Sequence, residues 1–184
     1  MKMKNKINKA ILFAVKKHQN QFRKGTDLPY IVHPLSVMMC LVEMGASEDA
    51  IIGGVLHDTL EDTNTSYREL KWKFGKKVAD IVKSCSENKS LSWKERKQET
   101  IVKLMCPPME DVFMVELADK LCNLRDIHRE RWGIGFWKRF KVSKKSLGWY
   151  YGGLCESIKY HTKQVGKFQK ECEEFSRKYK EVFE

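Results

Sequence analysis

Hydrophobic residues recur along most of this chain at intervals of three and four positions, which is the pattern of amphipathic α-helices. Serine-led capping sequences, glycines and a Pro-Pro pair divide the pattern into segments. The segments predicted as helices are 6–24, 34–44, 47–58, one from Ser66, one from Ser92 to Pro107-Pro108, 109–127, 136–141 and 143–179, the last broken near Gly152-Gly153. Strand signals are nearly absent. The sequence therefore predicts an all-α protein, a bundle of about eight to ten helices.

The length and composition fit one globular domain. The chain has 184 residues, of which 42% are hydrophobic and 32% charged, and this balance excludes a disordered or collagen-like chain. It contains neither an internal repeat nor a low-complexity linker. We therefore expect a single domain over residues 1–184, with C-terminal helices over about 136–184.

The sequence also indicates a cellular compartment. No apolar run approaches the roughly 18 residues that a membrane span needs, and the first residues lack the apolar core and cleavage site of a secretory signal. The six cysteines are irregularly spaced and include no Cys-x-x-Cys pair. We expect reduced thiols, a cytoplasmic protein and no membrane partner. Neither composition nor motifs indicate an oligomeric state.

The positive charge is unevenly distributed. The net charge is +11, but residues 1–26 hold eight basic residues and no acid, 27–126 hold 13 basic and 17 acidic, and 127–184 hold 14 basic and seven acidic. Between Leu28 and Tyr67 there is no Lys or Arg, although six acids and two histidines lie there. A surface that binds only nucleic acid would not need such an acidic, histidine-bearing segment, and we expect no nucleic-acid partner.

The pair His57-Asp58 stands at the end of an apolar helical run and is the clearest candidate for metal binding. At a fraying helix end the two side chains can converge on one ion, and imidazole with carboxylate suits Mn, Fe, Zn or Mg. His33 and Asp119 are candidates for two further ligands. Asn123 follows Asp119 by four positions, so both lie on one helix face and address one cavity.

Each of these residues also has an ordinary structural explanation. A His-Asp pair is common, His33 before Pro34 fits a turn, and Asp119 could pair with a neighbouring cation on a solvated face. The metal interpretation is favoured because the polar groups lie within the most apolar helices, where they need partners or an ion.

Six ordered motifs together resemble a known family, the HD-superfamily hydrolase domain of RelA/SpoT-type proteins. The similarity is greatest to the small stand-alone alarmone hydrolases of the metazoan SpoT-homologue type, and it covers about residues 8–130. The motifs are Arg23-Lys24-Gly25, Pro29-Tyr30-Ile31, His33-Pro34, Leu56-His57-Asp58-Thr59, Glu61-Asp62-Thr63 and Leu117-Ala118-Asp119-Lys120-Leu121 followed by Asn123-Leu124-Arg125.

The resemblance implies a fold, a reaction and a set of site residues. It implies a helical HD domain that removes the 3′-pyrophosphate from the small-molecule nucleotides guanosine tetra- and pentaphosphate, (p)ppGpp, giving GDP or GTP and pyrophosphate. It also implies Mn(II) as the cofactor. The implied residues are His33, His57, Asp58 and Asp119 as metal ligands, and Arg23, Lys24, Asn123 and, by rough spacing, Arg139 as substrate contacts. Glu61 lies one helical turn beyond His57, near enough to orient a water or take its proton, and Asp62 can assist protonation of the departing ribose 3′-oxygen. We assign these two catalytic roles jointly to Glu61 and Asp62.

Some positions depart from the long Rel proteins. Lys120 and Asp126 agree with the stand-alone hydrolases, whereas Cys122 is unusual. The Gly-Gln that the family shows after His18 is replaced by Gln19-Asn20-Gln21, close to Arg23. The chain has no room for a synthetase domain, so an alarmone enzyme of this kind would only hydrolyse.

Two other functions remain open at this point. The first is an HD phosphohydrolase for another nucleotide, such as the 2′-phosphate of NADPH, which would need the same metal site. The second is a non-catalytic nucleotide or nucleic-acid binding module that uses the basic ends. For Arg23, Lys24, Lys94 and Arg139 a solvated helix face is the alternative. Aromatic residues between Trp132 and Tyr151 alternate with basic ones, and helical spacing favours a core face over a stacking surface.

Overall fold

The computed structural model describes the backbone from Lys2 to Glu184 and the side chains from Lys6 onward. Helices account for most of this part of the chain, and it contains no β-sheet, so the all-α prediction is confirmed. The helices are α1 (Lys2–Lys17), α2 (Val32–Glu43), α3 (Glu48–Leu56), α4 (Thr59–Asp62), α5 (Tyr67–Phe74), α6 (Lys76–Cys85), α7 (Trp93–Met105), α8 (Glu110–Glu130), the 3-10 helix η1 (Phe136–Arg139), α9 (Lys144–Val165) and α10 (Gln169–Phe183).

Several helices begin where the sequence signals predict. Ser47 caps α3 by accepting a hydrogen bond from Ala50 N, and Ser92 forms a complete capping box with Glu95 at the start of α7. Ser66 opens α5 by accepting from Glu69 N, while the Glu69 carboxylate pairs with Lys17 at 3.1 Å. These caps satisfy backbone N–H groups that have no partner within their helix.

The predicted first helix is too long. It was expected to reach Lys24, but α1 ends at Lys17, and the chain then turns back on itself. An isolated β-bridge joins Phe22 and Pro29, and Tyr30 N donates to Gln21 O at 2.8 Å. Contacts between residues seven and nine positions apart therefore override the local helical pattern.

The predicted break at Gly152-Gly153 is wrong, because both glycines lie inside α9. The chain instead turns at Gly166, whose φ of 67° is in the left-handed region, before α10 begins. The two helical glycines allow close packing: a Cβ on Gly153 would lie 2.5 Å from Ile101 Cδ1, and one on Gly152 would lie 2.9 Å from Tyr179 Oη.

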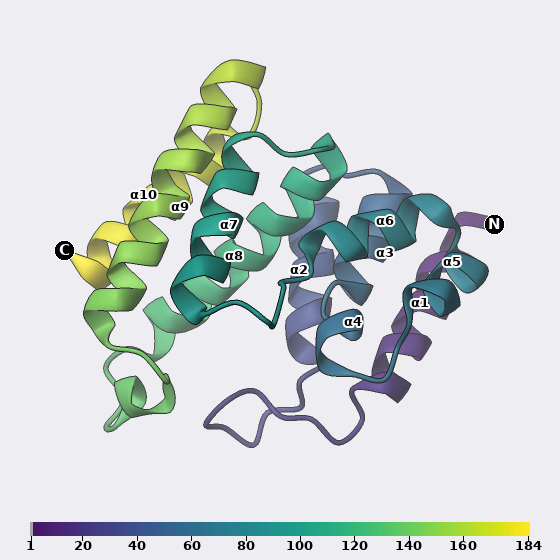
Figure 1. Ribbon diagram of the computed structural model, residues 1–184, viewed down its shortest axis with the longest axis horizontal. Coiled ribbons are helices and arrows are strands. Elements are labelled where there is room, and N and C mark those ends of the chain that lie inside the picture. The colour runs from purple at the N-terminus through teal and green to yellow at the C-terminus, as the bar shows by residue number, and fades with distance from the viewer. Residues whose placement is uncertain (1) are drawn as a thin grey trace. The chain divides into compact units, whose positions relative to one another are not determined.

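The chain contains two compact units that alternate along the sequence (Figure 1). The first unit runs to Glu87 and includes Met109–Asp119; the second comprises Asn88–Pro108 and Lys120–Glu184. In the first unit α3 is central and packs on α1, α2 and α6, and in the second α9 packs on α7 and α10. The single domain over 1–184 stays a prediction.

The aromatic and basic stretch in the second unit contributes mainly to packing. Phe136, Tyr150 and Tyr151 are buried, and Tyr151 stacks on Phe183 with ring centroids 5.5 Å apart. Trp132, by contrast, is exposed. Trp149 is also exposed, so the contacts support the prediction of a core face for the three buried aromatic residues but not for these two tryptophans.

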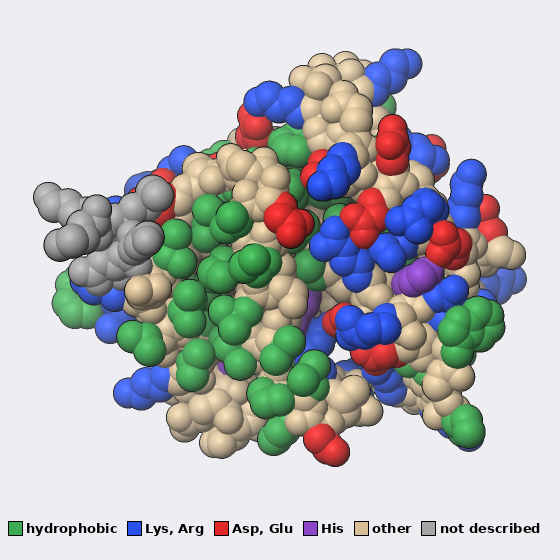
Figure 2. Space-filling view, turned by 180° about the vertical axis from the view of Figure 1, so that it is seen from behind, with side chains coloured by type: hydrophobic (Ala, Val, Ile, Leu, Met, Phe, Trp, Pro, Cys, Tyr) green, Lys and Arg blue, Asp and Glu red, His purple; other side chains and the backbone are tan. Residues whose placement is uncertain are grey.

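On the face drawn in Figure 2, hydrophobic side chains are exposed in one region and most of the basic side chains in another. In the first unit the exposed large apolar residues include Leu12, Met39 and Trp72. In the described part of the chain, no helix combines the length and the apolar composition of a membrane span. All six cysteines are free thiols.

Candidate metal centre

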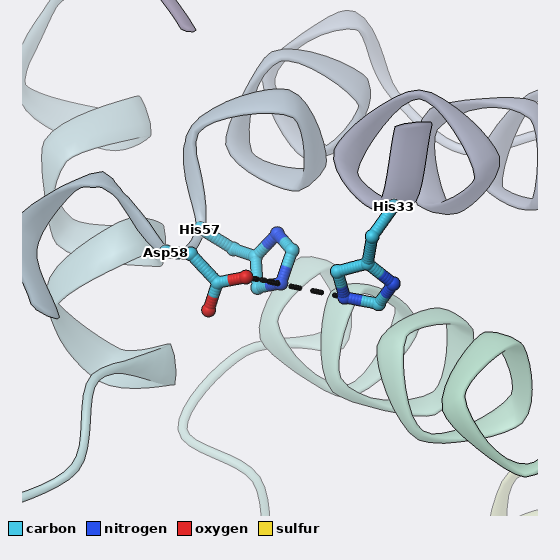
Figure 3. A group of neighbouring side chains, drawn as sticks. All are labelled: His33, His57 and Asp58. Carbon is cyan, nitrogen blue, oxygen red and sulfur yellow. Dashed lines mark ion pairs between the residues drawn. The ribbon is translucent and has the colours of Figure 1, made fainter. Parts of the chain in front are cut away.

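Two helix ends bring the candidate imidazoles together. His33 is the second residue of α2, and His57 is the residue at which α3 ends. Both side chains are buried, with 3% and 4% of their residue surface exposed. Figure 3 shows that His33 approaches from α2 while His57 and Asp58 approach from the end of α3. One donor atom from each of the three residues lies within 4.8 Å of the others.

The backbone between α3 and α4 directs Asp58 toward this cluster. Asp58 keeps near-helical angles (φ −89°, ψ −7°), but the helix is interrupted there and a new turn begins at Thr59. Its Oδ2 atom lies 2.8 Å from His57 Nε2 and 3.9 Å from His33 Nε2. The sequence predicts that neighbouring His and Asp side chains can converge at a disrupted helix end. The side chains of His57 and Asp58 have this arrangement.

Asp119, which lies on α8, is the fourth residue of the candidate donor set. It is 7% exposed, and its Oδ1 atom accepts a hydrogen bond from His33 Nε2 at 2.9 Å. The same oxygen is 3.7 Å from His57 Nε2. All four predicted ligands thus lie in the first unit, although 86 positions separate His33 from Asp119.

A backbone hydrogen bond orients the His57 imidazole toward the cluster. Its Nδ1 atom donates to Gly54 O at 2.7 Å, so Nε2 faces the carboxylates. This buried Nε2 is close to Asp58 but has no hydrogen-bond partner of acceptable geometry. An unsatisfied imidazole nitrogen facing two carboxylates fits a divalent metal, and the set of two nitrogens and two oxygens suits Mn, Fe or Zn.

The electrostatics of the metal-free cluster show how strongly it favours positive charge. Burial lowers the pKa of His57, but the negative charges of Asp58 and Asp119 outweigh it and raise that pKa to about 9. Burial would raise the pKa of Asp58, yet the neighbouring imidazoles of His57 and His33 hold it below its usual range. The two carboxylates therefore favour a positive charge next to them.

The two predicted catalytic carboxylates follow on α4 and differ from each other. Glu61 is half-buried, and its Oε2 atom accepts from Glu87 N at 3.1 Å. Burial raises the pKa of Glu61 despite that hydrogen bond. Asp62 is exposed, and its backbone oxygen accepts from Gln21 Nε2 at 2.6 Å.

The predicted substrate contacts divide between the units. Arg23 and Lys24 lie in the loop after α1 in the first unit, with Arg23 half-buried and Lys24 exposed. Asn123 and Arg139 belong to the second unit. Arg139 bonds Glu130 at 2.6 Å and lies 4.1 Å from the centre of the Phe136 ring. These contacts account for Arg139 structurally, and its role with substrate stays a prediction.

Tyr30 is a member of the cluster that sequence reasoning did not assign a role. Its Oη atom donates to Asp58 Oδ2 at 2.6 Å. Burial and the charge of Asp58 raise the pKa of Tyr30 far above its usual value, so the phenol remains a donor. Its place in the motif, three residues before His33, was the only signal available in the sequence.

A family model for the HD domain matches residues 10–134 of this chain. The chain therefore belongs to the HD domain family, and the resemblance found in its motifs is confirmed. The matched range ends close to the end of α8 and includes all four candidate ligands.

Named relatives agree with this membership. The chain is 36% identical over 175 residues to guanosine-3′,5′-bis(diphosphate) 3′-pyrophosphohydrolase of Aquifex aeolicus, covering 94% of this chain but only 24% of that protein. It is 40% identical over 128 residues to guanosine-3′,5′-bis(diphosphate) 3′-pyrophosphohydrolase MESH1 of Xenopus tropicalis, covering 67% of this chain and 70% of the relative. The chain thus spans about a quarter of the first relative and over two thirds of the second.

Two solved structures share the fold. One is described as a metazoan ortholog of SpoT that hydrolyzes ppGpp; it aligns with a TM-score of 0.78 at 23% identity over 95% of this chain and 94% of its own. The other, lmo0812 from Listeria monocytogenes, aligns with a TM-score of 0.72 at 33% identity over 82% of this chain and 98% of its own. The predicted helical HD fold is therefore confirmed.

Proposed function

We propose that the protein hydrolyses the 3′-pyrophosphate of guanosine tetra- and pentaphosphate, using Mn(II) held by His33, His57, Asp58 and Asp119. The observation that carries the proposal is the buried cluster of two imidazoles and two carboxylates with Glu61 one turn beyond His57. The names of the Aquifex and Xenopus relatives supply the substrate class.

The chemistry needs an activated water, a proton acceptor and charge neutralisation. When bound, Mn(II) would supply Lewis acidity that polarises a phosphate oxygen and lowers the pKa of water. Water attacks the phosphorus that is bonded to the ribose 3′-oxygen, and the bond between them breaks. The products are GDP or GTP, with a free 3′-hydroxyl, and pyrophosphate.

Glu61 and Asp62 move the protons of this reaction. Because burial raises the pKa of Glu61, its carboxylate is a stronger base than an exposed one and suits the proton of the attacking water. Asp62 would assist proton delivery to the departing 3′-oxygen. Arg23 and Lys24 neutralise and orient the substrate, since a guanidinium and an ammonium both bind phosphate oxygens; Asn123 contacts the nucleoside and Arg139 a phosphate.

The decisive experiment is product analysis with purified protein and guanosine tetraphosphate, with and without Mn(II). We expect equal amounts of GDP and pyrophosphate only when the metal is present. Release of orthophosphate would contradict the pyrophosphohydrolase, and an intact alarmone with dephosphorylated NADPH would identify another HD phosphohydrolase. Parallel loading with Zn(II), Mg(II) and Mn(II) tests the metal.

The proposal includes a cytoplasmic location. All six cysteines are free thiols, which is the state of a reducing compartment. Fractionation of the source cells, with the protein detected by antibody, tests this part independently of activity.

A further inference from the structure

The Asp58 carboxylate is held by a phenol as well as by the histidines. Tyr30 Oη donates to Asp58 Oδ2 at 2.6 Å, and this is the same oxygen that lies 2.8 Å from His57 Nε2. An ionised carboxylate can rotate about its Cβ–Cγ bond and present either oxygen. The bond from Tyr30 selects one orientation.

The Tyr30 ring is itself fixed by two neighbours. It packs on the buried His18 ring with centroids 4.9 Å apart, and its edge meets His33 at 6.2 Å. Its backbone N–H donates to Gln21 O, and His18 Nδ1 donates to Gln21 Oε1 at 2.7 Å. The phenol therefore reaches Asp58 from a braced position rather than from a mobile loop.

The same ring also contacts the loop that carries the candidate substrate residues. The Arg23 guanidinium carbon lies 5.8 Å from the centre of the Tyr30 ring, within the range of a cation–π contact. Arg23 N donates to Leu28 O at 2.8 Å, which closes the loop between them. One side chain thus touches a candidate metal ligand at its hydroxyl and a candidate phosphate-binding arginine at its face.

We infer that Tyr30 is a positioning residue. It orients the Asp58 carboxylate for the metal, and it holds the Arg23 guanidinium in a fixed position relative to that carboxylate. Hydrogen-bonded supports of this kind orient ligands, and losing one typically weakens metal binding by about 10- to 100-fold. Only the part that concerns Arg23 rests on the proposed function, because the effect on metal affinity needs no substrate.

The test compares two tyrosine-to-phenylalanine variants of the full chain. Tyr30→Phe removes the hydroxyl but keeps the ring. Tyr67→Phe is the matched control, since Tyr67 Oη donates to Asp80 Oδ1 at 2.7 Å and that carboxylate is not in the cluster. Mn(II) binding is titrated by the paramagnetic resonance signal of the free ion, and circular dichroism shows that the metal-free variants are folded.

We expect the Mn(II) dissociation constant to rise by about 10- to 100-fold in Tyr30→Phe and to stay unchanged in Tyr67→Phe. At saturating Mn(II), Tyr30→Phe should lower kcat with little change in KM. Tyr30→Leu, which also removes the ring under Arg23, should raise KM in addition.

Unchanged Mn(II) affinity in folded Tyr30→Phe would overturn the inference, as would equal losses in both variants or no Mn(II) binding by the wild type. If the affinity falls as expected but no variant, nor the wild type, hydrolyses guanosine tetraphosphate, the inference stands and the proposed function fails.

Discussion

Each unit of the protein places a histidine beside a carboxylate, and the two pairs differ in burial and in their neighbours. In the first unit the side chains of His57 and Asp58 are 5% and 17% exposed, and no Lys or Arg among the side chains described from Lys6 onward forms an ion pair with them. In the second unit His128 meets Glu181 with 24% and 40% exposed, and Arg177 shares the same carboxylate.

This difference is the one expected between a reactive site, as we propose for the first pair, and a structural contact. Around His128 the side chains are partly exposed and Arg177 also binds the Glu181 carboxylate, so the pair is a solvent-screened contact between α8 and α10. Around His57 the buried Nε2 atom has no hydrogen-bond partner of acceptable geometry and faces the carboxylates of Asp58 and Asp119. Burying such groups costs free energy, and an ion that repays that cost explains the arrangement.

Removing each histidine in turn is the strongest test of whether the two pairs differ in role. His57→Ala should abolish Mn(II) binding and reduce alarmone hydrolysis by on the order of 10³-fold or more, because the metal's contribution is lost. His128→Ala should leave both unchanged within a factor of about two. Titration with Mn(II) and pyrophosphate release measure the effects, and equal losses in the two variants would show that the pairs do not differ in role.

The carboxylates of α4 provide the next largest effect. Glu61→Gln should lower kcat by about 10²- to 10⁴-fold, since a group positioned for proton transfer contributes that much. Mn(II) affinity should change little, because Glu61 is not among the proposed ligands. Glu181→Gln in the second unit is the control and should retain full kcat; an unaffected kcat in Glu61→Gln would contradict the assignment.

The pH dependence of Mn(II) affinity also distinguishes His57 from His128. In the metal-free protein the pKa of His57 is raised to about 9, above its ordinary value of about 6.5, so the proton must leave before the metal binds. Mn(II) affinity should therefore rise about tenfold per pH unit between pH 6.5 and 8.5 and level off above pH 9. Protonated His57 stabilises the metal-free fold, and this contribution is fully present below the unfolded pKa and lost as pH rises through 9.

Mn(II) titrations at three pH values check this slope. The variant His128→Ala should show the same slope as the wild type, since that histidine lies outside the cluster. An affinity that does not change between pH 6.5 and 8.5 would mean that no proton is displaced.

The smallest effect is expected in the second unit. Arg125 binds Glu174 through two hydrogen bonds of 2.8 and 2.7 Å, but the side chains are 34% and 21% exposed. Glu174→Gln should lower the free energy of unfolding by no more than about 1 kcal/mol and leave Mn(II) affinity unchanged. Urea denaturation measures this, and a loss of several kcal/mol would show that this pair is as critical as the buried cluster.

Features that depend on a few neighbouring residues could be predicted from the sequence. Ser47 and Ser92 cap their helices as expected. His57 and Asp58 converge because α3 ends at His57 and α4 begins only after Asp58. The candidate metal ligands were brought together in the prediction with the help of motifs, since nothing local in the sequence places Asp119 beside His33.

Features that depend on distant contacts were missed or misplaced. The end of α1 is decided by the bridge between Phe22 and Pro29. The two glycines of α9 form no turn; they allow Ile101 and Tyr179 to pack closely against the helix. The bond from Tyr30 to Asp58 spans 28 positions. Residue type alone could not distinguish such a phenol from any other half-buried tyrosine.

The division of the first unit along the chain has a consequence for biosynthesis. Residues up to Glu87 include three of the four proposed ligands, but Asn88–Pro108 of the other unit must be made before Met109–Asp119 can follow. A nascent chain therefore passes through a stage in which His33, His57 and Asp58 have emerged and Asp119 has not. Because contacts between residues far apart in the sequence form late in folding, we expect a metal ion to be held by all four candidate ligands only after the chain has been made as far as Asp119.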